Sequence, residues 1–258
     1  MVLLILLSAI LRQAAAGAGA PPPEKLLAAA IEAQRIQDKK GWKYTYREDK
    51  DEFHFNKKGE RLEPSRKTFD VIMLEGENYR KLILENGNPL SDKLQKQVDR
   101  ELEQSRAERK KRSIVTFTRS VSLGGLDELS RLFDSKVTGE EVVRGRNSWR
   151  VESTPKPDVK PSNKKDEEAM STLRTTWLDQ QEPVILKERH TFLRPANSFQ
   201  PGSQFEREYV KVGGSWLPDL VIWKGNLKAL AIIKARFETH YRYYDYKRFE
   251  VESKITTQ

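Results

Sequence analysis

The side chains best suited to proton transfer or metal binding near neutral pH are three histidines, His54, His190 and His240. They are far apart in the sequence, and no two of them have the spacing that would place them side by side on one helix or strand. Histidines on the polar face of a strand are the ordinary case. We therefore predict no metal site.

Close pairs of acids are the second candidate for chemistry. Asp49 with Asp51, and Glu140 with Glu141, stand next to predicted turns, where solvated carboxylates are more common than a general acid and base. No glycine-rich phosphate loop follows a predicted strand, and neither G-x-S-x-G nor H-E-x-x-H occurs. We therefore predict that the protein is not an enzyme, with no catalytic residues and no cofactor.

The chain is strongly basic, with 47 Lys and Arg against 38 Asp and Glu and a formal net charge of +9. Most cations alternate with acids, which is typical of a solvated sheet face and not of a nucleic-acid surface. The one dense cluster contains Arg109, Lys110, Lys111 and Arg112. It either closes a charged helix at its negative end or contacts envelope proteins or an anionic membrane surface. Were the N-terminus misread, it would instead resemble a nuclear import signal. We predict a monomer with no nucleic-acid partner.

The N-terminus predicts the compartment. Residues 2–11 are apolar and are followed by a tract of small residues at 14–20, as in a secretory signal peptide, although no Lys or Arg precedes the apolar run. The alternative is an apolar N-terminal helix packed on the domain. We predict that residues 1–20 are removed and that the mature protein is secreted, into the periplasm if the source is bacterial. The chain has no Cys, so no disulfide stabilises it.

Two kinds of periodicity predict the fold. Alternation of apolar and polar residues marks about ten strands, four of them before residue 86 and the last at 249–255. Between residues 175 and 223 the pattern is one of consecutive hairpins, with Gly213 and Gly214 supplying the positive φ of a tight turn.

Helical spacing predicts helices at 24–40, 91–112 and 127–133, and a Pro-, Lys- and Asp-rich stretch at 154–168 is predicted to be a charged loop. We predict a mostly β (α+β) fold in one domain, residues 21–258. It would be a strongly curved antiparallel sheet or incomplete β-barrel with helices packed on its concave side.

The order of these elements resembles the outer-membrane lipoprotein-sorting, LolA/LolB-like superfamily. The sequence segments that carry the resemblance lie within residues 140–224. They are Trp177-Leu178-Asp179, Val184 to Lys187, Phe205 to Tyr209 and Gly213 to Pro218. The resemblance implies an incomplete barrel whose concave face, lidded by helices, binds acyl chains in the bacterial periplasm. The chain departs from the family pattern in its charged loop and its Tyr-rich C-terminal tract.

We expect the ligand, an acyl chain, lipid or lipoprotein, to contact large apolar side chains of the curved strands. They are Phe69, Val71, Leu82, Trp177, Phe205, Tyr209, Trp216 and Trp223. The lid is expected from the two central helices, at Leu94, Val98, Leu102, Leu129 and Phe133. The alternative is an envelope interaction or stress-sensing module of the same fold whose concavity is closed by its own side chains.

The densest aromatic tract, Tyr241 to Tyr246, has two interpretations. Its tyrosines either stack on a glycan or lipid headgroup, or they cover the core of a strand pair while their hydroxyls reach water.

Overall fold

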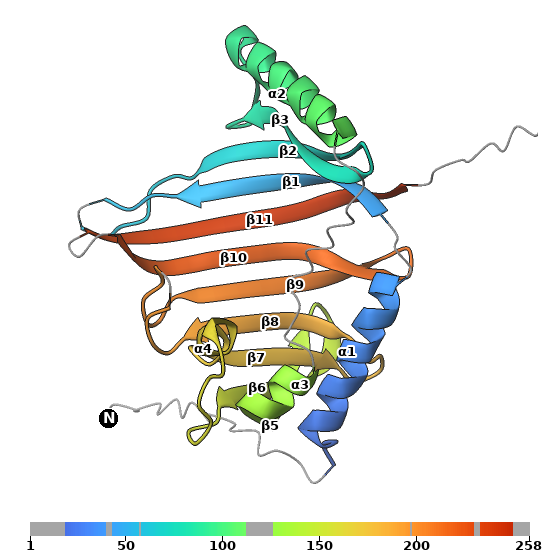
Figure 1. Ribbon diagram of the computed structural model, residues 1–258, viewed down its shortest axis with the longest axis vertical. Coiled ribbons are helices and arrows are strands. Elements are labelled where there is room, and N and C mark those ends of the chain that lie inside the picture. The colour runs from blue at the N-terminus through green and yellow to red at the C-terminus, as the bar shows by residue number, and fades with distance from the viewer. Residues whose placement is uncertain are drawn as a thin grey trace, which may run out of the picture.

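The computed structural model describes residues 19–39, 43–56, 58–111, 126–196, 198–229 and 233–249. Within them one antiparallel sheet has eleven strands in the order β4-β3-β2-β1-β11-β10-β9-β8-β7-β6-β5 (Figure 1). The sheet is open, with β4 at one edge and β5 at the other. The predicted fold class, a mostly β protein built on an antiparallel sheet that does not close into a barrel, is confirmed.

The strands are β1 (Lys43–Phe53), β2 (Ser65–Leu74), β3 (Glu77–Glu85), β4 (Asn88–Pro89), β5 (Phe133–Val143), β6 (Arg146–Pro155), β7 (Thr172–Asp179), β8 (Ile185–Phe192), β9 (Gln204–Val212), β10 (Ser215–Ala229) and β11 (Ile233–Phe249). The helices are α1 (Pro23–Lys39), α2 (Asp92–Lys111), α3 (Leu126–Leu132) and α4 (Lys164–Ala169). None of these helices is both long and apolar enough to span a bilayer. Apart from Gly19 and Ala20, the predicted signal peptide lies outside the described residues.

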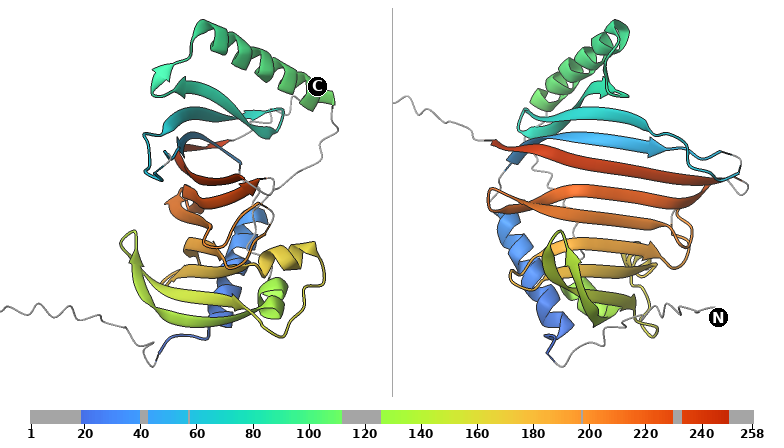
Figure 2. Two further views of the ribbon diagram at one scale, coloured as in Figure 1. Left: turned by 90° about the vertical axis from the view of Figure 1, so that its left-hand side faces the viewer. Right: turned by 180° about the vertical axis from the view of Figure 1, so that it is seen from behind.

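Three helices, α1, α3 and α4, lie on one face of the sheet, over the half that contains β5 to β8 (Figures 1 and 2). We call this the helix face, and the opposite one the outer face. Leu27 and Ala30 of α1 are buried against Val151, Leu178 and Ile185 of the sheet. Burial of each large apolar side chain contributes about 1.5 to 3 kcal/mol, so this cluster fixes α1 on the helix face.

The hairpin between β9 and β10 agrees with its prediction. Ser215 pairs with Val212, and Gly213 and Gly214 both have positive φ, at 54° and 82°. A two-residue turn with two positive φ angles matches the right-handed twist of the strands that it joins. This turn therefore fixes the register of the two strands that carry Tyr209 and Trp216.

Two strands are longer than predicted. The predicted strands at 42–47 and 52–56 are one strand, β1, so three strands instead of four precede residue 86. The acidic stretch between them is not a turn, because its side chains are paired across the sheet, Asp51 with Arg66 at 2.6 Å. Similarly, β11 continues through the tyrosine tract to Phe249. The rest of the predicted last strand lies outside the described residues.

The charged stretch at 154–168 is not all loop, because it contains most of α4. The helix begins after Asn163, whose side chain accepts a hydrogen bond from the backbone of Asp166. Arg131 of α3 pairs with the buried Asp166 carboxylate through two hydrogen bonds, of 2.8 and 2.7 Å. This pair joins α3 to α4. Hydrogen bonds from Arg131, and from the backbone of Ser162, hold the pKa of Asp166 at about 2, below its ordinary value.

We predict that Arg131→Gln changes how stability depends on acid. A carboxylate with a lowered pKa stabilises the fold above its unfolded pKa of about 4, and this contribution is lost as the pH falls toward 2. The variant is expected to have a lower urea midpoint than the wild type at pH 6, with the difference disappearing as the pH approaches 2. Arg35→Gln, in an exposed pair with Glu32, is the control. It should leave the urea midpoint unchanged both at pH 6 and near pH 2. A constant difference between wild type and R131Q at every pH would contradict the assignment.

Candidate functional site

Six of the eight predicted ligand-binding residues lie on the helix face, in two groups. Phe69, Val71 and Leu82 belong to β2 and β3, where Phe69 is directly opposite Leu82. Phe205, Tyr209 and Trp223 belong to β9 and β10, where the rings of Phe205 and Trp223 are 4.6 Å apart. Strands β1 and β11 separate the two groups. Contact between these residues and a ligand remains a prediction.

Trp177 and Trp216 are placed elsewhere. Trp177 is directly opposite Lys187 on the outer face, and its indole donates to Glu141. Trp216 packs beside it in a separate buried cluster with Val143 and Leu186. Trp177 and Trp216 thus lie in a different cluster from Phe205, and contact of these two tryptophans with a ligand also remains a prediction. The pairing of β7 with β8 is irregular here: Trp177 pairs with Lys187 and Leu178 with Ile185, so Leu186 of β8 is an extra residue. Such a bulge cannot be read from alternation.

The two predicted parts of the lid are also far apart. Leu94, Val98 and Leu102 belong to α2, which lies at the β3 edge of the sheet, while Leu129 of α3 and Phe133 of β5 lie at the other end (Figure 1). Asp99 of α2 pairs with Lys81 of β3. The helical spacing predicted both helices correctly, but it contains no information about which strand each one covers.

The basic cluster has a structural role at its first residue. The guanidinium of Arg109 donates to the backbone oxygens of Leu74, Glu77 and Asn78 at 3.0 to 3.2 Å, and so fixes the end of α2 on the hairpin between β2 and β3. Lys110 lies 3.9 Å from Glu75. Arg112 lies outside the described residues. Arg109, Lys110 and Lys111 do stand in the last turn of α2, but the contacts of Arg109 are with the hairpin.

An aromatic cluster that the sequence analysis missed covers Trp223. Phe199, in the turn between β8 and β9, stacks on Phe192 at 5.0 Å and on Trp223 at 5.6 Å, and lies 5.9 Å from Phe237. Ser203 in the same connection is fully buried and exchanges hydrogen bonds with the backbone of Asn226. The loop thus carries an aromatic ring onto the apolar part of the helix face.

A buried ionic cluster lies next to these rings. Glu188 of β8 is only 2% exposed; it accepts from Tyr209 at 2.9 Å and lies 3.2 Å from Arg207 of β9. Burial alone would raise the pKa of Glu188, but interactions with His190 and Arg207 lower it below its usual range. Burial raises the pKa of the Tyr209 hydroxyl. Charged residues were predicted only on solvated faces, so this cluster was also missed.

The tyrosine tract divides between the two faces. On the helix face, the ring of Tyr46 packs against Tyr243 at 5.8 Å and Tyr246 at 5.1 Å. The hydroxyl of Tyr246 donates to the backbone oxygen of Pro218, and burial raises the pKa of Tyr243. Tyr244 points to the outer face. The rings that pack together favour the interpretation that this tract covers the core.

Several buried side-chain nitrogens have no hydrogen-bond partner among the described residues. They are Nε and Nη1 of Arg174, Nε2 of His190 and Nε of Arg207 on the helix face, and Nε of Arg150 on the outer face. The His190 nitrogen is 3.7 Å from Glu188, too far for a hydrogen bond. Most buried polar groups in native proteins are paired, so the three helix-face residues stand out.

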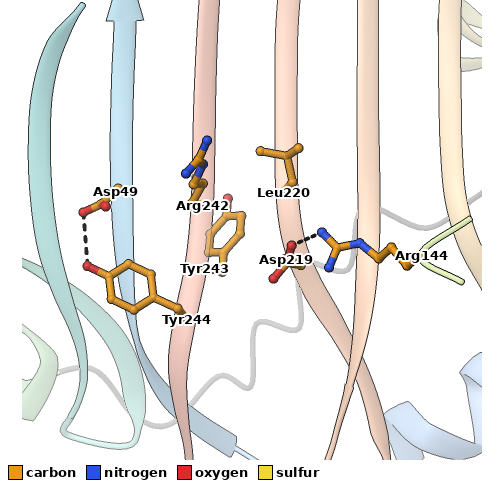
Figure 3. A pocket seen from close by; sticks show the side chains of 7 residues that line it. All are labelled: Asp49, Arg144, Asp219, Leu220, Arg242, Tyr243 and Tyr244. Carbon is orange, nitrogen blue, oxygen red and sulfur yellow. Dashed lines mark hydrogen bonds and ion pairs between the residues drawn. The ribbon is translucent and has the colours of Figure 1, made fainter.

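The outer face has an open hollow of about 510 Å³ over β1, β11 and β10 (Figure 3). Its charges are largely paired, Arg144 with Asp219 and Asp49 with the hydroxyl of Tyr244. Figure 3 also labels Leu220, Arg242 and Tyr243 around the hollow, although the ring of Tyr243 packs against Tyr46. No predicted binding residue lines this hollow.

In the part of the chain that the structure describes, His190, His240 and the acid pairs contact other side chains. No group of three or more potential metal ligands is found among these residues. His190 packs on Phe205, and His240 on Phe53. Glu141 accepts a hydrogen bond from Trp177, and Glu140 from Gln180. These side chains therefore have structural partners.

No protein-family model matches the chain, and no curated protein matches it. Solved structures with similar folds include a DUF1329 family protein from Desulfovibrio piger, with TM-score 0.38 and 13% identity over 93% of this chain and 96% of that one. A LolA superfamily protein from Nitrosomonas europaea has TM-score 0.33 and 10% identity over 93% and 99% of the two chains.

A putative outer membrane lipoprotein-sorting protein domain from Vibrio parahaemolyticus has TM-score 0.36 and 10% identity over 90% of this chain and 95% of that one. The superfamily that the sequence resembles is thus among the similar structures. The likeness is one of general architecture and carries no information about a ligand.

Proposed function

We propose that this protein is a secreted, periplasmic binding or carrier protein that holds an acyl chain, lipid or lipoprotein on the helix face. The observation that supports this most directly is the concentration of large apolar side chains there, with Trp223 in contact with both Phe205 and Phe199. Apolar surface moved from water onto such a face contributes about 25 cal/mol per Å². The proposed activity is binding, with no bond made or broken.

A closed interaction module of the same fold is the second candidate. It is supported by Glu188, Arg207 and Tyr209, which fill the middle of the helix face with paired polar groups. In such a module the surface that contacts a partner protein would lie elsewhere, and the helix face would have no ligand.

Native mass spectrometry of the protein purified from its own envelope fraction tests the two candidates. The carrier function predicts a stoichiometric mass increment that organic extraction removes and lipid analysis identifies as acylated. A protein at its apo mass that also takes up no added lipid or acylated peptide would overturn the carrier function and favour the closed module.

A further inference from the structure

We infer that the helix face binds an amphiphile with an anionic headgroup, a carboxylate or phosphate, through Arg174, His190 and Arg207. This inference rests on the proposed function and adds to it the class of ligand. The three side chains come from β7, β8 and β9, which are neighbours in the sheet. Arg174 is directly opposite His190, and His190 is directly opposite Phe205.

The hydrogen-bonding capacity of these residues fits a group rich in acceptor oxygens. Arg174 is only 5% exposed and uses one nitrogen, Nη2, to bind Glu128 at 2.9 Å, which leaves Nε and Nη1 without an acceptor among the described residues. The Nε of Arg207 similarly has no acceptor among them. A guanidinium has donors and no acceptor, so an alcohol or an alkane would not satisfy it as well as a carboxylate or phosphate would.

The local charges also favour an anion. Glu128 is shared between Arg174 and Lys165, which lie 2.9 and 3.6 Å from it. Glu188 balances Arg207. The buried charges of Arg174, Arg207, Glu128 and Glu188 therefore cancel, and the excess positive charge next to them is that of Lys165, whose side chain is 81% exposed.

Apolar rings lie directly beside the donors. The guanidinium of Arg174 lies 4.4 Å from the ring centroid of Phe133, and that of Arg207 lies 5.0 Å from Phe205. Phe205 in turn contacts Trp223. A headgroup bound by Arg174 and Arg207 would thus have its chain against Phe205 and Trp223. Because the donor nitrogens are buried, side chains around them have to move aside when the headgroup enters.

The test compares three ligands that have the same chain, dodecanoate, dodecyl phosphate and dodecanol, added to the delipidated full-length protein and titrated by calorimetry. We expect either anion to bind at least about tenfold more tightly than the alcohol, the effect of one good charge-assisted hydrogen bond. Comparison of the two anions identifies which headgroup is preferred. Equal affinity for all three would overturn this inference and leave the carrier function intact, whereas binding of none would overturn both.

Variants test the residues. Glu128→Gln/Arg174→Gln removes the ion pair without leaving a buried unpaired charge, and it should abolish the preference for the anions while dodecanol still binds. Arg150→Gln is the matched control, because Arg150 also has a buried Nε without a described acceptor but lies on the outer face. Thermal unfolding establishes that each variant is folded. An unchanged anion preference in the double variant, or its loss in R150Q, would overturn the assignment.

Discussion

Replacement of Arg207 with methionine is expected to lower the free energy of unfolding by about 3 to 5 kcal/mol, because it leaves Glu188 as a buried charge without its guanidinium. The side chain of Glu188 is 3% exposed and that of Arg207 is 13% exposed, so water does little to screen the loss. Tyr209 would remain as a hydrogen-bond donor to the carboxylate. Urea denaturation at pH 7 measures the effect.

Two controls separate the buried charge from the lost side chain. Glu188→Gln/Arg207→Met removes both charges and should recover most of the stability, since the glutamine has no charge to bury. Arg189→Met breaks the neighbouring pair with Glu206 on the outer face, where Arg189 is 36% exposed. Such a pair is worth at most about 1 kcal/mol. Equal losses of unfolding free energy in R207M and R189M would contradict the assignment of Glu188 and Arg207 as a buried ion pair.

Gly225→Ala is expected to destabilise the protein by about 2 to 5 kcal/mol, through overpacking and an unfavourable positive φ. Gly225 has φ 148°, and a Cβ there would lie 2.5 Å from the Cα of Ser203. Ser203 is fully buried and cannot move without the loop that carries Phe199. The variant should therefore lose stability and also the stacking of Phe199 on Trp223, which tryptophan fluorescence reports.

Gly139→Ala is the matched control. Gly139 has a similar φ of 157°, but a Cβ there would meet no atom of the described residues within 4 Å. It should lose only the conformational contribution, about 1 to 2 kcal/mol, with unchanged fluorescence. Equal stability of the two alanine variants would contradict the close packing of Gly225 in β10 against Ser203.

Periodicity predicted the elements of this fold better than it predicted their faces. The helical stripe of α1 and the glycine turn between β9 and β10 are local features, and both were predicted correctly. The length of β1 was not predicted correctly, because two of its acids are paired with cations of other strands, Asp51 with Arg66 of β2 and Glu48 with Arg80 of β3. Local hydrophobic patterns contain no information on such partners.

Ligand contact at the candidate site remains a prediction, and the surroundings of its residues could be predicted only in part. Alternation is a reliable guide to the face of a strand only where the pairing is regular, and bulges interrupt β8 at Leu186 and β10 at Asp219. The ionic cluster of Glu188 and Arg207 could not be found from hydropathy, since a buried ion pair has the same composition as a solvated one. Phe199 was missed because it lies in a loop.

Site-specific photocrosslinking tests most directly whether an acyl ligand lies against the helix face. Benzoylphenylalanine would replace Trp223 on the helix face in one variant and Trp177 on the outer face in another, both expressed in the native envelope and irradiated before extraction. We expect an acyl adduct at position 223 and none at position 177. An adduct at 177 alone, or equal labelling at both positions, would contradict binding on the helix face.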